Sequence, residues 1–316
     1  MIIAFQLHTS LLAVSLLLTA CQTASQRARL TAEDLEAGRG DSLNAIAFAR
    51  SRFVAVGGDG MVVSSTDGMR WVRHQAGTTA ALHGAACGGT TWVAVGNGGT
   101  LLTSADGRRW SATCSEFTGD LRAVVSGCGM FVAVGDSGGV LTSVDGLAWQ
   151  LRASGVSTAL RAIAFGNGRF VALGADHTIV TSPDGVAWTD HSDALDACFR
   201  GLAFGNGKFV AIGCKDTVAT STDGVTWRNH SLGRHPYMQG VTFARGRFIA
   251  IGERGGIICS TDGEIWTQLD SGSTARLRGI AFGKGGFVVV GAKGTTLTSA
   301  DGQTWKGASV MTAKPE

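Results

Sequence analysis

The stretch Ser182-Pro183-Asp184-Gly185-Val186-Ala187-Trp188 decides the fold, because its pattern Ser-x-Asp-Gly-x-x-Trp recurs at a constant interval. The pattern occurs seven times, and each Asp follows the previous one by 39 residues. A period of roughly 40 residues is typical of propeller blades, in which each repeat forms one small sheet. The seven aspartates are Asp67, Asp106, Asp145, Asp184, Asp223, Asp262 and Asp301.

One repeat, residues 160–188, divides into four short strands. Residues 160–173 predict two apolar strands around a tight Gly-Asn-Gly turn, and residues 178–182 predict the third. We expect Asp184-Gly185 to form a two-residue hairpin turn, since Asp-Gly readily adopts positive φ angles, and the fourth strand to carry Trp188. The sequence therefore predicts an all-β fold, a seven-bladed β-propeller of 39-residue, four-stranded blades, each continuous in the chain.

Aromatic residues recur at two further positions of the repeat. The position of Phe170, in the second strand, is Phe or Trp in every repeat. The position of Trp188, at the end of the pattern, is always Trp. Burying an aromatic side chain removes a large apolar area from water, so both columns are expected to hold the blades together. We predict that Trp188→Ala costs about 3–5 kcal/mol of stability.

The N-terminus precedes the repeats and differs from them. Residues 1–20 contain an apolar run too short to span a membrane, and Leu18-Thr19-Ala20-Cys21 resembles the lipobox of bacterial lipoproteins. The resemblance implies a signal peptide over 1–20 and lipidation of Cys21, with Gln22 favouring an outer-membrane anchor facing the periplasm or the surface. An ordinary secretory signal, giving a soluble secreted or periplasmic protein, is the alternative. We expect a polar tether over 21–41, the propeller over 42–309 and a tail over 310–316.

Composition excludes several classes of function. Charged residues make up 16% of the chain and the net charge is +3, so neither disorder nor bulk attraction to nucleic acid is indicated. The seven histidines are scattered without zinc-ligand spacing. We therefore expect no metal, no cofactor and no nucleic-acid partner, and a monomeric protein.

The segment from Asn97 to Trp110 resembles the Asp-box, or BNR, repeats of sialidases and of photosystem II assembly-factor-like propellers. The resemblance covers about residues 42 to 309, although here Gly follows Asp directly, without the usual intervening residue. In that family the Asp accepts backbone hydrogen bonds and catalyses nothing. Asp in a turn normally bonds its own backbone, so the seven aspartates are interpreted as structural.

A sialidase-like glycan hydrolase is the alternative to a binding protein. Such an enzyme needs a Tyr nucleophile and an arginine triad, but this chain has one tyrosine, Tyr237, and no Arg-Ile-Pro segment. The uniform spacing also leaves no room for the long insertions that catalytic propellers carry. No residue is therefore assigned as catalytic, and a non-enzymatic function is favoured.

Partner binding is expected on the face where the repeats differ, since short variable loops on a rigid scaffold usually carry binding. The variable turns there include Asp176, His177 and Tyr237. One column at the start of the first strand consists of Asn44, His83, Arg122, Arg161, Arg200, Gln239 and Arg278. Around the channel mouth it would form a positive ring for a carboxylate or an acidic peptide. Alternatively, each arginine bridges neighbouring blades by bonding backbone carbonyls. The family resemblance implies a basic patch for protein docking.

Two cysteines are placed symmetrically about a predicted hairpin. Cys198 and Cys214 lie at equal distances from Asn206, so they should face each other across two strands within disulfide range. An oxidising compartment favours the bond, and we predict a Cys198–Cys214 disulfide. Cys87 and Cys259 are expected to be buried free thiols.

Together these observations predict a lipid-anchored scaffold or assembly-factor-like propeller of the bacterial cell envelope. It would recognise an envelope protein or a glycan through its variable face and touch the membrane only through its anchor.

Overall fold

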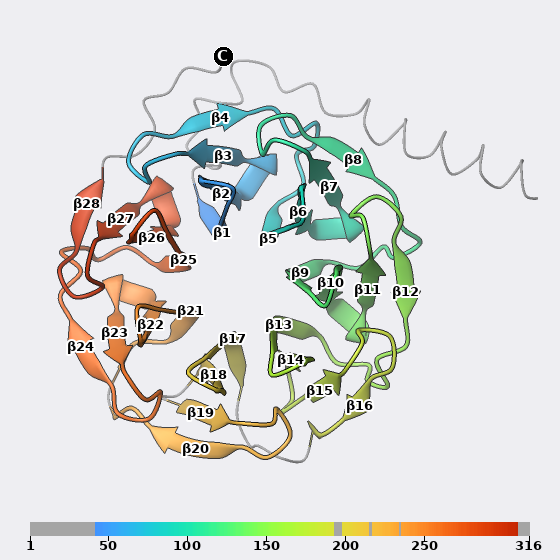
Figure 1. Cartoon of the computed structure of the whole chain (residues 1–316). Coiled ribbons are helices and arrows are strands. Elements are labelled where there is room, and N and C mark those ends of the chain that lie inside the picture. Colours follow the sequence, from blue (N-terminus) through green and yellow to red (C-terminus); the bar gives the residue numbers. More distant parts are fainter. Residues whose placement is uncertain (1–41, 193–197, 215–216, 234, 309–316) are drawn as a thin grey trace, which may run out of the picture.

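The computed structural model describes residues 42–192, 198–214, 217–233 and 235–308. These residues form seven four-stranded antiparallel sheets arranged as a ring (Figure 1). Each sheet takes its strands in sequence order, so blade 1 is β1–β4 and blade 7 is β25–β28. The predicted all-β, seven-bladed propeller with continuous blades is confirmed.

The first strands lie innermost around the central channel (Figure 1). They are β1 (Leu43–Ala49), β5 (Leu82–Gly88), β9 (Leu121–Gly127), β13 (Leu160–Gly166), β17 (Phe199–Gly205), β21 (Met238–Ala244) and β25 (Leu277–Gly283). The second strands are β2 (Arg52–Gly57), β6 (Thr91–Gly96), β10 (Met130–Gly135), β14 (Arg169–Gly174), β18 (Lys208–Gly213), β22 (Arg247–Gly252) and β26 (Gly286–Gly291).

The third strands are β3 (Val62–Ser65), β7 (Leu101–Ser104), β11 (Val140–Ser143), β15 (Ile179–Ser182), β19 (Thr217–Ser221), β23 (Ile257–Ser260) and β27 (Thr296–Ser299). The fourth strands form the outer rim as β4 (Val72–His74), β8 (Ser111–Thr113), β12 (Gln150–Arg152), β16 (Thr189–Asp190), β20 (Arg228–Ser231), β24 (Thr267–Leu269) and β28 (Lys306–Ala308). Single 3-10 turns follow five second strands: η2 (Gly58–Gly60), η3 (Asn97–Gly99), η4 (Asp136–Gly138), η6 (Glu253–Gly255) and η7 (Ala292–Gly294).

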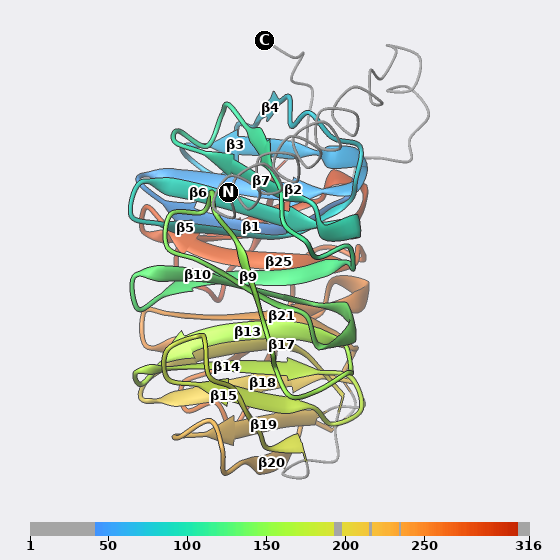
Figure 2. The same cartoon turned by 90° about the vertical axis from the view of Figure 1, so that its right-hand side faces the viewer.

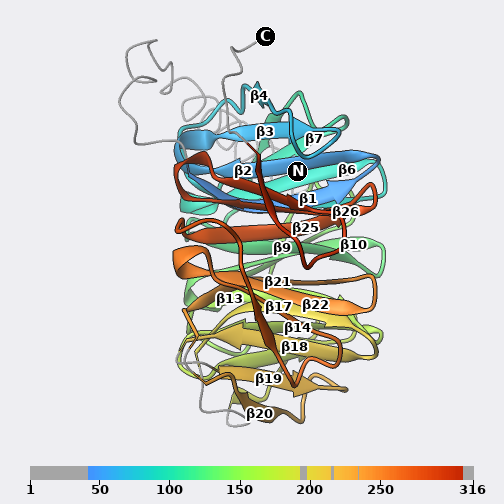
Figure 3. The same ribbon diagram turned by 90° about the vertical axis from the view of Figure 1, so that its left-hand side faces the viewer.

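The strands run from one face of the disc to the other, as the edge-on views show (Figures 2 and 3). Antiparallel order therefore places the first hairpin of each blade and its Ser-x-Asp-Gly loop on one face, here called the Asp-box face. The turns after the second strands and the links between blades lie on the other, here called the link face. This is the division of faces that the repeat predicts.

The core is built on the second strands, which are packed between neighbouring blades. In β14 every residue after Arg169 is buried, and the other six second strands follow the same pattern. A strand covered on both faces needs a continuous apolar run, which is what Phe170-Val171-Ala172-Leu173 supplies. Gly174 ends the strand because a Cβ there would lie 2.3 Å from the carbonyl oxygen of Ala159.

Two expectations about the Asp-Gly loop are wrong. Thr181 pairs with Thr189, so the loop between the third and fourth strands is much longer than a two-residue turn. Gly185 has a positive φ of 75°, whereas the φ of Asp184 is not positive. Trp188 ends this loop instead of lying in the fourth strand, and it is only partly buried. The loop differs because Asp184 acts as a hydrogen-bond acceptor and does not take up the left-handed conformation.

Candidate binding site at the mouth of the central channel

The variable column of the first strands lies at a backbone irregularity that recurs in every blade. In blade 4 Leu160 pairs with Gly174 and Ala162 pairs with Leu173, so Arg161 between them has no partner in the ladder. The same register shift skips the corresponding residue in each of the other blades. A bulge re-aims the extra side chain, which explains why the column turns toward the channel.

The structure brings the whole column together around one cavity of about 380 Å³ at the channel mouth on the link face. Its lining consists of Asn44, His83, Arg122, Asp136, Ala159, Arg161, Arg200, Gln239 and Arg278. A second cavity of about 250 Å³ is lined by the same column and by the next residues of the first strands. The predicted ring of basic side chains is thus present as a geometric feature.

The charge of the ring is uneven because Arg122 is neutralised. Its Nε and Nη2 atoms donate to the two carboxylate oxygens of Asp136, each at 2.9 Å. Nη2 also lies 3.1 Å from Asp120. The hydrogen bond to Asp136 raises the pKa of Arg122 above its ordinary value. Blade 3 therefore contributes two carboxylates and one guanidinium to the rim, a net negative charge.

Two other members of the column bind neighbouring polar groups. His83 Nε2 lies 2.5 Å from Asn97 Oδ1. Arg278 Nη1 donates to Asn44 Oδ1 at 2.6 Å, and Asn44 Nδ2 donates to the carbonyl of Leu82 at 2.9 Å. These bonds connect blades 7, 1 and 2, so part of the column does bridge blades. Burial, followed by nearby Arg276, lowers the pKa of Arg278 below its ordinary value.

The remaining arginines project beside the predicted cysteine pair. Arg161 Nη1 lies 3.7 Å from Cys198 Sγ, and Arg200 is exposed. Cys198 and Cys214 face each other as predicted, with their Sγ atoms 2.8 Å apart, but both are free thiols in this structure. Strand register dictates the facing geometry, whereas bond formation also needs an oxidant. The covalent bond therefore stays a prediction.

Three arginines of the mouth, Arg161, Arg200 and Arg278, have no carboxylate partner among the residues that the structure describes, and we call them the arginine arc. The difference lies in the residue 14 positions after each arginine, which in blade 3 is Asp136, the partner of Arg122. There the three blades carry Ala175, Cys214 and Ala292. In the part of the chain that the structure describes, Arg122, Arg161 and Arg278 contact the side chains of Asp136, Cys198 and Asn44, and not the backbone carbonyls that the bridging alternative predicts.

The other predicted binding residues lie on the link face but outside the cavity lining. Asp176 and His177 occupy the turn between β14 and β15, both with positive φ, and both are exposed. Tyr237 is 50% exposed, and its carbonyl accepts the N–H of Glu253 at 2.9 Å. They are exposed at the surface of the link face, outside the lining of the cavity.

The aspartates of the repeat are structural, as blade 1 illustrates. Asp67 Oδ1 accepts the N–H groups of Met69 and Arg70 at 2.8 Å each and the Ser65 hydroxyl at 2.9 Å. Ser65 Oγ in turn accepts the N–H of Gly68 at 2.8 Å. Burial alone would raise the pKa of Asp67, but these donors outweigh it and lower the pKa. All seven loops repeat the bonds to the carboxylate.

Asp120 and Asp136 are the site residues whose role the sequence did not reveal. Asp136 was recognisable as a variable turn residue, yet its pairing with Arg122 requires the 14-residue offset between the bulge and the 3-10 turn. That offset recurs as His83 with Asn97, so comparing the two columns would have found it. Within the described ranges, no cluster of three metal-ligating side chains and no helix able to span a membrane is found. Cys21 lies outside the described residues.

No family model matches the chain, and no curated protein matches it. Among solved structures, YCF48 bound to a D1 peptide is 19% identical, covers 82% of this chain and 93% of its own, and superposes with a TM-score of 0.68. YCF48 from Cyanidioschyzon merolae is 18% identical, and the match covers 82% of this chain and 96% of that chain with a TM-score of 0.66. The WD40 β-propeller domain of Doa1 is 15% identical, and the match covers 82% of this chain and 93% of that chain with a TM-score of 0.62. The expected similarity to assembly-factor propellers is thus confirmed for the fold.

Proposed function

We propose that this protein is a non-enzymatic binding propeller that holds an acidic segment of a partner protein over the arginine arc. The observation that carries the proposal is that Arg161, Arg200 and Arg278 line one cavity and, among the residues that the structure describes, have no carboxylate partner. A guanidinium donates two parallel hydrogen bonds to a carboxylate, so three of them on a rigid rim form a pre-organised binding site for acidic side chains or a chain terminus. Asp120 and Asp136 repel such a ligand on the blade 3 side and so orient it.

The fold is compatible with this function. A propeller of similar fold, YCF48, has been solved with a D1 peptide bound, which supports peptide recognition as a use of this architecture. In this chain, the groups that would bind the peptide are the bulge-directed arginines of the arc. Asp176, His177 and Tyr237 would extend the contact surface outward from the channel mouth.

We also propose that the protein is located in the cell envelope. Lipidation at Cys21 would hold the propeller near a membrane through residues 21–41, leaving both faces of the disc accessible. Cys21→Ser should move the protein from the membrane fraction to the soluble fraction in the cells that produce it. Retention in the membrane fraction would contradict the anchor without bearing on the arginine arc.

A fluorescein-labelled hexaglutamate peptide with a free C-terminal carboxylate tests the arc directly. Fluorescence anisotropy should show saturable binding that the double variant Arg161→Glu/Arg200→Glu weakens by at least about tenfold, since attraction becomes repulsion. Circular dichroism checks that the variant is folded.

The matched control is Arg70→Glu/Arg109→Glu, which makes the same change in net charge on exposed residues of the Asp-box face. It should bind the peptide like the parent protein. Equal losses in the two variants would show that only net charge matters, and no loss in the arc variant would remove the site. A glycan partner would appear as binding of neutral oligosaccharides that the arc variant leaves unchanged.

A further inference from the structure

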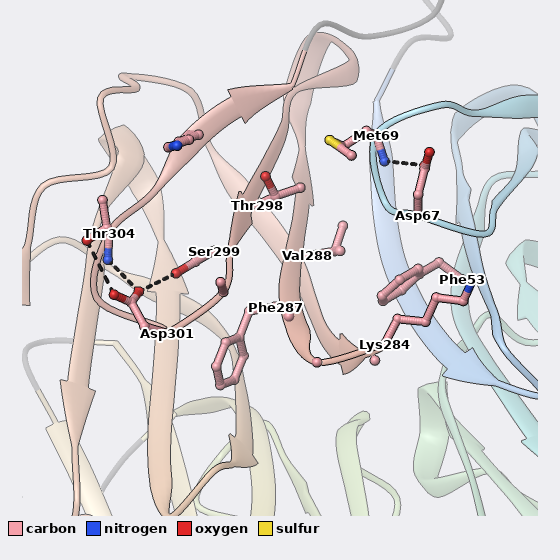
Figure 4. A pocket seen from close by; sticks show the side chains of 15 residues that line it. Phe53, Asp67, Met69, Lys284, Phe287, Val288, Thr298, Ser299, Asp301 and Thr304 are labelled. Carbon is pink, nitrogen blue, oxygen red and sulfur yellow. Dashed lines mark hydrogen bonds between the residues drawn. The ribbon is translucent and has the colours of Figure 1, made fainter.

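A cavity distinct from the two at the channel mouth lies on the Asp-box face, at the seam where blade 7 meets blade 1. It measures about 430 Å³ and is bounded by β26, β27 and the Asp-box loops of both blades. Figure 4 shows Phe53, Asp67 and Met69 of blade 1 facing Val288 of blade 7 across it, with Lys284 of blade 7 reaching toward Phe53. Blades 7 and 1 lie side by side in the ring (Figures 1 and 3).

At the other six seams, the first residue of the second strand reaches toward the Asp-box loop of the following blade. An atom of that side chain lies within 4 Å of a Cβ built on the loop glycine in five cases, from Arg52, Thr91, Met130, Arg169 and Arg247. In the sixth, Lys208 Nζ bonds Glu264 of the next Asp-box loop at 2.9 Å. This side chain therefore fills the space below each loop.

Blade 7 has Gly286 at that position. The corresponding loop glycine, Gly68, meets only Val288 and Phe53, with nothing from residue 286. A Cβ built on Gly286 would itself have no neighbour closer than 3.2 Å, from the carbonyl oxygen of Ser299. The cavity exists because one filler side chain is missing at one seam.

The lining combines an apolar slot with two cations. Phe53 and Val288 belong to the core cluster of this seam, and Met69 is 56% exposed at the rim. The exposed Lys284 and Lys306 have no hydrogen bond or ion pair among the described residues. A slot of this kind suits an apolar group whose end carries a negative charge.

The two carboxylates in the lining are held by their own loops and bond neither lysine. Asp67 Oδ1 is held by two backbone N–H groups and a hydroxyl, as described above. Asp301 Oδ1 accepts the N–H groups of Thr304 and Gln303 at 2.8 Å each, which with the Ser299 hydroxyl lowers its pKa. Both aspartates therefore stay ionised with Oδ1 occupied within their own loops, and the two ammonium groups are left to bind the carboxylate of a ligand.

We propose that this seam pocket is a binding site for a small amphiphilic carboxylate, whose apolar chain enters the slot and whose carboxylate meets one of the exposed lysines at its edge, Lys284 or Lys306. The volume of about 430 Å³ falls within the range of small-molecule pockets, roughly 300–1,000 Å³, and favours a small ligand over an extended peptide. The site is separate from the arginine arc, which lies on the opposite face. The pocket is not a general feature of the repeat, since only the seam between blades 7 and 1 lacks the side chain that fills this space at the other six.

Decanoate, used below its micelle concentration, is the probe. Isothermal titration calorimetry should show one site, and NMR shifts should concentrate on residues 283–288 and on Met69. Gly286→Arg restores the residue found at three other seams and should weaken binding by at least about tenfold. Lys284→Gln/Lys306→Gln should reduce decanoate affinity by about tenfold but leave the binding of uncharged decanol unchanged.

Thr91→Arg is the matched control, because it adds the same side chain at a seam that is already filled, and it should bind decanoate like the parent protein. Should Gly286→Arg lower the melting temperature, Gly286→Thr, which copies blade 2, fills the same space with a smaller group. The proposal is overturned if decanoate does not bind, if filling residue 286 leaves affinity unchanged, or if the shifts fall elsewhere. Binding of an acidic, apolar peptide but not of decanoate would identify a protein-docking groove and likewise overturn it.

Discussion

At the residue scale, the repeated aspartate is a structural acceptor whose protonation state matters for folding. The N–H groups of Ile265 and Glu264 donate to Asp262 and hold its pKa at about 2, although burial opposes this. An unfolded Asp titrates near roughly pH 4. Because the folded pKa is the lower one, the stabilisation is complete above about pH 4 and is lost as the pH falls toward about 2.

Asp262→Asn tests this linkage. Asparagine keeps an acceptor oxygen but cannot titrate, so the variant's free energy of unfolding should fall less steeply between pH 5 and about pH 2 than that of the parent. Urea unfolding at several pH values in that window measures the difference. Parallel curves for the two proteins would contradict the assignment of Asp262 as a carboxylate acceptor.

The sequence predicted that the variable column of the first strands meets at the channel mouth, but it did not predict which of its members pair with a carboxylate. The column of Arg122, Arg161, Arg200 and Arg278 is recognisable because it breaks the repeat, and the structure does bring it to one cavity. Which arginines are left without a carboxylate depends on residues 14 positions away on a 3-10 turn. That contact becomes visible only once the bulge and the turn are placed in space.

At the element scale, the second strand and the Asp-box loop do not contribute equally to the core. Phe170 in β14 is 0% exposed, whereas Trp188 is partly buried at the end of its loop, with Nε1 donating to the carbonyl of Gly185 at 2.9 Å. The seven tryptophans of this column are not buried alike, since those at 71, 110 and 305 are buried and the other four are only partly buried.

Phe170→Ala should therefore destabilise the protein more than Trp188→Ala. We expect about 3–5 kcal/mol for the buried phenylalanine, the usual cost of emptying such a site, and about 1–3 kcal/mol for the tryptophan. Urea denaturation of the two variants gives both values on one scale. The order would be disproved by a larger loss for Trp188→Ala.

At the scale of the whole molecule, the ring closes without exchanging a strand between its ends. Blade 1 and blade 7 each have all four strands, and β1 packs against β25 as other first strands pack against their neighbours. Every seam therefore rests on packing and on hydrogen bonds between blades, with no exchanged strand, and the position of the chain ends is incidental to the fold.

A circular permutant examines this equivalence. Ala308 would be joined to Leu43 by a copy of residues 153–159, which connect blades 3 and 4, and new ends would open between Gly77 and Thr78. The melting temperature should stay within about 4 °C of the parent, because every blade is kept whole. A permutant opened inside β6, between Val93 and Ala94, should fail to fold. Loss of cooperative unfolding in the first permutant would show that the natural seam is special.

The sequence by itself determined the number of blades, the strand order and the two faces, because these follow from a constant period and an alternating chain direction. It also separated the structural aspartates from the variable mouth residues. Tertiary structure alone decided the long form of the Asp-box loop, the neutralisation of Arg122 and the opening left by Gly286. Each of these depends on contacts between residues that are distant along the chain or in neighbouring blades, and a pattern read within one repeat carries no information about them.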